Sequence, residues 1–464
     1  MHTISQRLRL ARVCGMLIAL AAAAPAYAGK DARLYDVHIL SEIARVGDFP
    51  NGQDAIAPET IICNVGDTVI GWHAAMNPDH PFIAYAMYRL QNGRFEQLGR
   101  SWAKHTFFVQ SQFFCGQCVN AGSQALGLGC ADTYTNTTNA NQFNLGPRQE
   151  IDPFTGIWNP CGSYFDGFPV DCLRNQGTGG LGPLDHRCVV NDSDLALPGA
   201  TYCYEAMYIV SGDVDPSNNI GSKACTMSWL GTSWFYMTPF DGNPLLYGPA
   251  VATRYLTGAP NELLGTVSDP GTIYVASKAT DLGGGTWHYE YAIYNYNYSR
   301  RIRSFAVPAP QEATVSNIEF HDGAGDPTNN WKGEFDPACG VVSWQTQTYG
   351  NNPAANALIW GALFNFRFDA KVAPGTGLVA LDAFLPGDGA NRLHTTVVTP
   401  STGCIKGDVN GDGIIDGNDI QSFVQTLLNP PCEQSRAYCA SDIDGNAAVN
   451  TLDAAGLAAL LLGP

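Results

Sequence analysis

Oxygen-bearing side chains recur at fixed intervals near the C-terminal end of this 464-residue chain. From Asp408 to Asp419 they fill positions 1, 3, 5, 9 and 12 of a twelve-residue loop. Gly413 at position 6 allows a sharp turn, and position 7 offers a main-chain carbonyl. Because Ca²⁺ takes six to eight oxygen ligands in such a flexible loop, the segment predicts a calcium site. The predicted ligands are Asp408, Asn410, Asp412, Ile414, Asp416 and Asp419.

The same pattern returns in a second loop further along the chain. Its predicted ligands are Asp442, Asp444, Asn446, Ala448, Asn450 and Asp453, with Ala448 offering its carbonyl. Ala447 replaces glycine at position 6, where the turn requires a positive φ, so this second Ca²⁺ site is predicted to be weaker. Each loop leads into an apolar segment with helical spacing, at 420–428 and 457–462.

Two calcium loops, each followed by a helix and each with Asp rather than Glu at position 12, closely resemble a type I dockerin over about residues 405–463. The resemblance implies two calcium loop–helix repeats and docking onto a cohesin-like protein or a cell-surface partner. The family reads its partner mainly through loop positions 10 and 11. Here these are Gly417 and Asn418, then Thr451 and Leu452, in place of the Ser/Thr pair common in cellulosome dockerins.

The N-terminal residues predict export. Three arginines precede an apolar run from Val13 to Ala24, and Ala26-Tyr27-Ala28 supplies the small-x-small pattern of a cleavage site. Residues 1–28 are therefore predicted to be a secretory signal peptide, which places the protein outside the cell or on its surface. No other apolar run is long enough to predict a membrane span.

Cysteine usage predicts a disulfide framework, as is common in exported proteins. Fourteen cysteines are present, and removal of Cys14 with the signal peptide leaves an odd number, so at least one thiol stays unpaired or bonds another chain. Cys115 and Cys118 are predicted to be structural, with a redox pair or half of a zinc site as alternatives. Cys432 and Cys439 are expected to pair with each other, or one of them with Cys404.

The predicted fold class is mostly β, because 50 Gly and 28 Pro favour short elements joined by turns. The first of its parts is a Cys-rich loop/β domain at 29–257, and the second is an antiparallel β-sandwich at 258–398. A linker at 399–404 leads to the small α-helical module at 405–464. The formal net charge of −17 argues against nucleic acid and anionic membrane surfaces as partners.

Period-two alternation supports the sandwich, most clearly from Trp287 to Tyr294. Trp287, Tyr289 and Tyr291 are predicted to form one core face. The residues expected to be exposed, where flat rings could stack on polysaccharide, are Tyr294, Tyr296 and Tyr298.

Residues 60–160 are dense in polar and aromatic chemistry, including His80-Pro81, Tyr88-Arg89, the run from Gly93 to His105, and Leu145 to Arg148. This combination resembles an uncharacterised family of secreted bacterial proteins with no known activity. The resemblance groups the chain without implying a function.

Within this region two kinds of site are conceivable. Glu96 with Glu150 or Asp152 could act as the acid/base pair of a glycosidase, which needs two carboxyl groups ~5–9 Å apart. His73, His80 and His105 with Glu96 could instead hold a transition metal. Glu96, His105 and Glu150 are therefore the candidate catalytic residues. The chain lacks a Walker loop, a G-x-G-x-x-G segment that opens a helix, an H-E-x-x-H motif and a G-x-S-x-G elbow.

The leading functional hypothesis is a secreted calcium-binding protein whose C-terminal module mediates extracellular attachment or assembly, with a large domain that binds or acts on polysaccharide. The first alternative is a hydrolase of O-glycosyl bonds in polysaccharide catabolism. The second is a structural cell-surface protein that uses calcium for rigidity.

Overall fold

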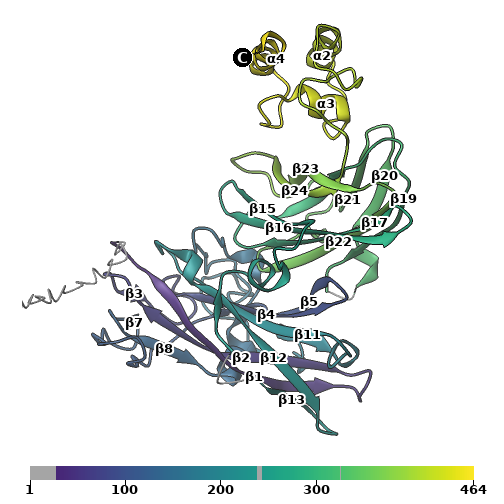
Figure 1. The fold of residues 1–464 in the computed structure, drawn as a ribbon. Helices are drawn as coiled ribbons and strands as arrows, with labels where there is room; N and C mark the ends of the chain where they lie inside the picture. The colour runs from purple at the N-terminus through teal and green to yellow at the C-terminus, as the bar shows by residue number, and fades with distance from the viewer. Residues whose placement is uncertain (1–27, 238–242, 324–325, 464) are drawn as a thin grey trace, which may run out of the picture.

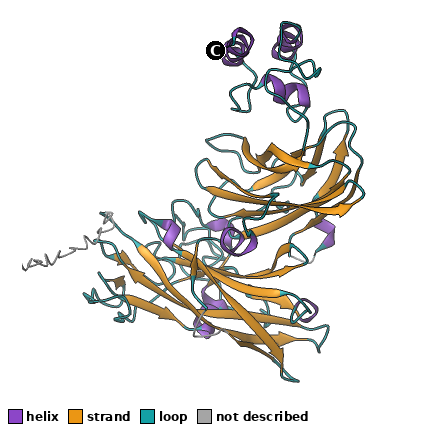
Figure 2. Cartoon of the chain, in the orientation of Figure 1, coloured by secondary structure: helices purple, strands orange, loops and turns teal. Residues whose placement is uncertain are grey.

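The computed structural model describes residues 28–237, 243–323 and 326–463, so most of the predicted signal peptide lies outside the described residues. Strands dominate the first two parts of the chain, and the longer helices gather at the C-terminal end (Figures 1 and 2). The mostly β prediction is confirmed. In the described ranges, no helix is both long enough and apolar enough to cross a membrane.

The N-terminal part is built on two antiparallel sheets and a short two-stranded ribbon. One sheet has the order β1-β2-β10, with β8 also on β2; the larger has the order β13-β12-β11-β4-β6-β9, with β5 on β4 and β14 on β12. The ribbon pairs β3 with β7. The strands are β1 (Ala32–Val46), β2 (Gln53–Asn64), β3 (Ile70–Gly71), β4 (Phe82–Gln91), β5 (Arg94–Arg100), β6 (Ala103–His105), β7 (Ala125–Leu126), β8 (Ala131–Tyr134), β9 (Leu145–Gly146), β10 (Cys188–Asn191), β11 (Thr201–Ile209), β12 (Ile220–Trp229), β13 (Trp234–Met237) and β14 (Leu246–Tyr247).

Short helical turns connect these strands, and one further turn lies in the sandwich. They are α1 (Asn136–Asn139), the 3₁₀ turns η1 (Gln142–Asn144), η2 (Arg148–Glu150), η3 (Asp192–Asp194), η4 (Pro216–Asn218) and η6 (Pro327–Asn329), and the π-turn η5 (Val251–Tyr255).

The second part is a sandwich of two five-stranded antiparallel sheets, ordered β15-β16-β17-β22-β19 and β20-β21-β18-β23-β24. Its core lies between the sheets and includes Tyr289, Tyr291, Phe305 and Trp344, all fully buried. The strands are β15 (Glu262–Ser268), β16 (Thr272–Gly283), β17 (Thr286–Asn295), β18 (Ile302–Pro308), β19 (Val315–His321), β20 (Lys332–Asp336), β21 (Val341–Gln345), β22 (Ala362–Ala370), β23 (Pro374–Ala383) and β24 (Arg392–Pro400).

A third apolar core joins the N-terminal part to the sandwich. Strand β4 sends Ile83 and Tyr85 into the N-terminal core and Phe82 and Ala84 into this shared core. Strand β17 likewise turns one face to the sandwich interior and the other, including Tyr294, to the N-terminal part. Both faces of these strands are buried, so apolar side chains point to both faces instead of only one.

This shared core overturns the prediction that three tyrosines are exposed. Tyr294 and Tyr298 are 1% exposed and Tyr296 is 7% exposed. The Tyr294 hydroxyl donates to Glu205 Oε1 at 2.9 Å, inside the junction. These rings are therefore unable to stack on a sugar, because the N-terminal part and neighbouring loops cover them.

Helices α2 (Asp419–Leu428), α3 (Arg436–Ser441) and α4 (Thr451–Leu462) form the C-terminal module, at the end of the sandwich away from the N-terminal part (Figure 1). Cys404 bonds Cys439 within the module, which agrees with one of the two predicted pairings. The alternative Cys432–Cys439 pairing is wrong, because Cys432 bonds Cys339 of the sandwich.

The remaining disulfides lie in the N-terminal part and pair Cys63 with Cys115, Cys118 with Cys130, and Cys161 with Cys172. Cys115 and Cys118 are both structural, in separate disulfides, so they form neither a redox pair nor half of a zinc site. Among the described residues, three buried cysteines form no disulfide, namely Cys188, Cys203 and Cys225.

Candidate functional site

The first acidic loop is organised by its first and last carboxylates. Asp419 is fully buried at the start of α2, and its carboxylate accepts hydrogen bonds from the main-chain N–H groups of Asn410 at 3.0 Å and Asp416 at 2.9 Å. Asp408, 1% exposed, accepts from Gly411 N–H at 2.8 Å and Gly413 N–H at 3.2 Å. These bonds fold the loop back on itself and gather its oxygens.

The second loop repeats this arrangement. Asp453 accepts from the main-chain N–H groups of Ile443 and Asn450 at 2.7 and 2.8 Å, and Asn450 caps α4. Carboxylate oxygens of Asp442, Asp444 and Asp453 all lie within 4.8 Å of one another. Across the described ranges, this is the one group of three or more acidic, His or Cys ligands that close together.

The donor set of both loops fits a hard cation. Asp408, Asp419, Asp442 and Asp453 are all at most 4% exposed, and burying carboxylates is costly unless positive charge compensates them. Two side chains supply part of that charge. Arg436 Nη2 lies 2.7 Å from Asp408 Oδ2, and Lys406 Nζ lies 3.3 Å from Asp442 Oδ2. Sequence reasoning missed both cations, because neither belongs to a twelve-residue loop.

The sequence of this module matches the family model described as "Dockerin type I domain" over residues 406–462. Residues 406–462 are a type I dockerin domain. Dockerins of this type generally bind calcium and generally bind cohesins. The dockerin domain thus supports a role in extracellular assembly or attachment.

No curated protein matches this chain. A serine-rich repeat adhesion glycoprotein from Streptococcus agalactiae aligns at 8% identity over 75% of this chain and 89% of its own, with a TM-score of 0.20. An exo-chitosanase from Amycolatopsis orientalis aligns at 10% identity over 74% of this chain and 25% of its own, with a TM-score of 0.14. Such TM-scores do not establish a shared fold.

Helix α2 of the dockerin domain has two apolar faces. Phe423 is 3% exposed and packs with Val409, Ala440 and Leu457 in the domain core. On a neighbouring side of the helix Ile420, Val424 and Leu428 are 48%, 43% and 71% exposed. Residues four apart lie on one side of a helix, so these three form a continuous stripe, called here the α2 stripe.

Ala447 adopts the left-handed conformation that its place in the second loop requires, with φ of 69°. A residue with a Cβ is strained there by roughly 1–2 kcal/mol, and glycine is not. Ala447→Gly is therefore expected to tighten calcium binding at the second loop several-fold, as measured by calorimetric titration. Ala448→Gly, at the next position, is the matched control and should give no gain. Equal effects of the two variants would contradict the strain argument.

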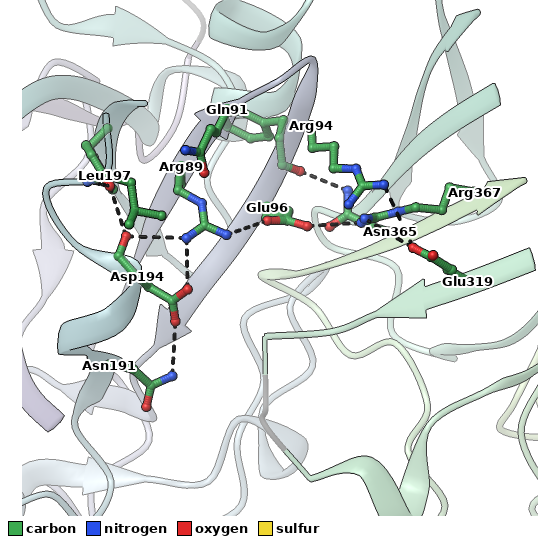
Figure 3. Close-up of polar contacts among 12 residues, drawn as sticks. Arg89, Gln91, Arg94, Glu96, Asn191, Asp194, Leu197, Glu319, Asn365 and Arg367 are labelled. Carbon is green, nitrogen blue, oxygen red and sulfur yellow. Dashed lines mark hydrogen bonds and ion pairs between the residues drawn. The ribbon is translucent and has the colours of Figure 1, made fainter. Parts of the chain in front are cut away.

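Glu96 lies in a network of charges between the N-terminal part and the sandwich (Figure 3). Its Oε2 accepts from Arg89 at 2.8 Å, and its Oε1 accepts from Arg367 of β22 at 3.0 Å. Burial alone would raise the pKa of Glu96, but the hydrogen bond from Arg89, the nearby charge of His321 and the hydrogen bond from Arg367 together hold that pKa below its usual value. A general acid needs a raised pKa, so this environment suits an ion-pair role.

Glu150 occupies a different environment. Its Oε1 accepts from the main-chain N–H of Tyr164 at 2.7 Å, and burial raises its pKa. It lines a cavity of about 360 Å³ that also includes Asp152 and Trp360 but not Glu96. In the described ranges, Glu96 and Glu150 share no hydrogen bond or ion pair, and Glu96 does not line the cavity that Glu150 and Asp152 line, so the carboxylate pair stays a prediction.

His105 and His80 form a buried pair, with His105 Nδ1 2.9 Å from His80 Nε2. Trp158 packs edge-on against His105, with ring centroids 4.7 Å apart. Burial lowers the pKa of His80 to about 4 and holds that of His105 well below its usual value. Both rings are therefore neutral near pH 7. No described group of three metal ligands contains a histidine, so His73, His80, His105 and Glu96 are not brought together as a metal site.

His288 on β17 extends the charged network. Its Nδ1 lies 2.7 Å from Asp369 Oδ1 and its Nε2 lies 3.2 Å from Glu290 Oε2. The hydrogen bond with Glu290, aided by Asp369, raises the pKa of His288 above its usual value of about 6.5.

A raised histidine pKa makes stability depend on pH. The contribution of His288 to the free energy of unfolding is fully present below pH about 6.5, and it is lost as the pH rises through the folded-state pKa of His288. His288→Gln should therefore cost less than about 1 kcal/mol at pH 6, with the difference from wild type shrinking at higher pH. Urea unfolding from pH 6 to 9 measures this, and a pH-independent difference would contradict it.

Proposed function

We propose that this protein is exported and that its calcium-loaded dockerin domain attaches the large N-terminal part and sandwich to a cohesin-like partner outside the cell. The observation that carries the proposal is the exposed α2 stripe beside a loop of gathered carboxylates. A stripe of Ile, Val and Leu on a small domain is a typical feature of a protein–protein interface. We infer that both loops bind Ca²⁺, the second more weakly because of Ala447.

The attachment of the dockerin domain to the sandwich also supports this role. The Cys339–Cys432 disulfide crosses between them, and Glu433 forms ion pairs with Arg392 at 2.5 Å and with His394. The large domain would therefore be presented in a fixed orientation to whatever the dockerin binds. A mobile linker at 399–404 would instead let the cargo swing freely.

Binding of the mature protein to a panel of immobilised cohesin domains, with calcium or with EDTA, tests the proposal. Val424→Asp and Ile420→Asp place a charge on the α2 stripe without touching the domain core, so each should weaken calcium-dependent binding about tenfold or more. Leu230→Asp, at an apolar residue of the N-terminal part that is 64% exposed, is the matched control. Binding by both stripe variants equal to wild type would refute this docking face.

Deleting the dockerin domain tests attachment in the cell. The deletion of 405–464 should also carry Cys339→Ser and Cys404→Ser, because both cysteines would otherwise lose their disulfide partners. Loss of cell or complex association is expected. Unchanged association would favour a structural surface protein that uses calcium only for rigidity.

We propose that the N-terminal part and the sandwich bind polysaccharide, and that together they are the cargo that the dockerin domain attaches. The alternative is a hydrolase of polysaccharide that uses Glu96 and Glu150. Incubation of the mature protein with polysaccharides separates the two, because a hydrolase releases reducing ends and a binding protein is only retained.

A further inference from the structure

A positively charged cavity lies where the N-terminal part meets the sandwich, away from the dockerin domain. Its volume is about 590 Å³. The N-terminal part contributes the segment 98–102, Arg148, Leu184, His186, Arg187 and Val189, and the sandwich contributes Gly323 and Ile359. The cavity is large enough for a small organic molecule, since ligand pockets range from about 300 to 1,000 Å³.

The charge of this cavity is unlike that of the chain around it. Arg100, Arg148, Arg187 and His186 line it, and none of its lining residues is Asp or Glu, on a chain with a formal net charge of −17. Within residues 28–237, 243–323 and 326–463, none of the three arginines has a carboxylate within ion-pairing distance. Asp322 and Asp185 act on Arg100 and His186 electrostatically, but both lie outside the lining.

Main-chain oxygens fix two of these arginines in place. Arg148, 5% exposed, donates to the carbonyls of Ser101 at 2.7 Å and Trp360 at 3.2 Å. Arg187 donates to the carbonyls of Ala140 at 2.9 Å and Pro183 at 2.6 Å. Carbonyl oxygens carry only partial charge, so these bonds orient the guanidinium groups without neutralising them. Burial and the nearby charge of Arg100 lower the pKa of Arg148 to about 10.

The rest of the lining suits a ring that carries hydroxyl groups. Trp102 and His186 stack in parallel with their ring centroids 3.6 Å apart, and the buried His186 Nδ1 has no hydrogen-bond partner in the described ranges. Amide side chains of Gln53, Gln149 and Asn191 complete the polar lining; Gln53 Nε2 donates to Asn191 Oδ1 at 2.9 Å, and Asn191 Nδ2 donates to Asp194 Oδ2 at 3.1 Å. An amide can both donate to and accept from a hydroxyl group. A sugar has such hydroxyl groups, and a bare inorganic anion has none.

We propose that this cavity binds an acidic saccharide, with its carboxylate or sulfate held by Arg100 and Arg187 and its hydroxyl groups held by the amide side chains. Guanidinium groups bind both oxyanions through paired, charge-assisted hydrogen bonds. Arg148 shapes the cavity, because its guanidinium hydrogen-bonds the carbonyls of Ser101 and Trp360 on the two sides of the junction. The site is independent of cohesin docking, since no residue of the dockerin domain lines it.

Calorimetric titration of the calcium-loaded mature protein tests the site. The probes are D-glucuronate, glucose 6-sulfate, glucose as the uncharged analogue, and sodium sulfate. At least one acidic sugar should bind at least tenfold more tightly than glucose, and added NaCl should weaken that binding. Arg100→Gln and Arg187→Gln should each weaken it about tenfold or more. Arg303→Gln, whose ion pair with Asp382 lies in another part of the sandwich, should leave it unchanged.

The four probes distinguish which ligand the cavity binds. Preference for glucuronate assigns a carboxylate ligand, and preference for glucose 6-sulfate assigns a sulfated one. Sodium sulfate binding as tightly as either sugar would overturn the saccharide assignment. Absence of binding by both acidic sugars at millimolar concentration, or equal losses in Arg303→Gln, would overturn the site. Thermal unfolding of Arg100→Gln and Arg187→Gln shows whether a loss of binding arises from a loss of folding.

Discussion

Arg367→Met is expected to lower the free energy of unfolding by about 3–5 kcal/mol, because it removes the cation from a buried set of carboxylates. The Arg367 side chain is 5% exposed and lies 3.0 Å from Glu96 Oε1 and 3.3 Å from Glu290 Oε2. Glu290 is itself only 2% exposed. Methionine preserves much of the side-chain volume, so the loss reports mainly on the charges left without a partner.

The network couples two parts of the chain, which sharpens the test. Glu96 and Arg89 belong to the N-terminal part, whereas Arg367 belongs to the sandwich (Figure 3). Glu290 also belongs to the sandwich, on β17. Urea unfolding of Arg367→Met should therefore show reduced cooperativity as well as reduced stability. Arg94→Gln is the matched control, because its side chain is 39% exposed and its ion pairs span 3.6 and 3.8 Å, and it should cost less than about 1 kcal/mol.

A double variant decides whether charge or packing causes the loss. Glu290→Gln removes one of the carboxylates that Arg367 neutralises, so combining it with Arg367→Met should recover part of the lost stability. Strictly additive losses in the double variant would contradict the electrostatic explanation and favour a packing defect.

Calcium removal should unfold the dockerin domain while leaving the sandwich and N-terminal part folded. At millimolar calcium and a site constant of about 10 μM, each site stabilises the domain by about 2.7 kcal/mol. Its apolar core is small, with Val409, Phe423, Ala440 and Leu457 as its buried members, so it has little other stabilisation to rely on. Hydrogen exchange in α2 and α4 should therefore accelerate strongly in EDTA.

Point variants connect that effect to individual loops. Asp419→Ala and Asp453→Ala each remove a fully buried carboxylate that accepts hydrogen bonds from its own loop, and each should reproduce part of the EDTA effect. Gln421→Ala, at an exposed position of α2, is the control and should behave as wild type. Re-added calcium should restore protection, because the disulfides at Cys404 and Cys432 keep the domain in place. Unchanged exchange in EDTA would contradict the prediction.

Local spacing predicted the two acidic loops, and their resemblance to a type I dockerin identified the domain. The predicted ligands of each loop lie within twelve consecutive residues, so the chain itself sets their geometry, and the positive φ at Ala447 follows from its loop position. The mostly β class was equally accessible, because alternation along a strand such as β17 is a local property. Alternation reveals that a strand has two faces but does not reveal what covers the second one.

Contacts between distant residues decided the rest. Tyr294 is buried because the N-terminal part packs on β17, and Cys432 bonds Cys339 because the dockerin domain folds back on the sandwich. Glu96 meets Arg367 across a separation of 271 residues, which turns a candidate catalytic carboxylate into half of an ion pair. No local sequence pattern predicts such a contact, because it depends on how two separate sheets pack against each other. The sequence therefore determined the calcium module, and tertiary packing determined the roles of Glu96, Tyr294 and the arginines of the junction.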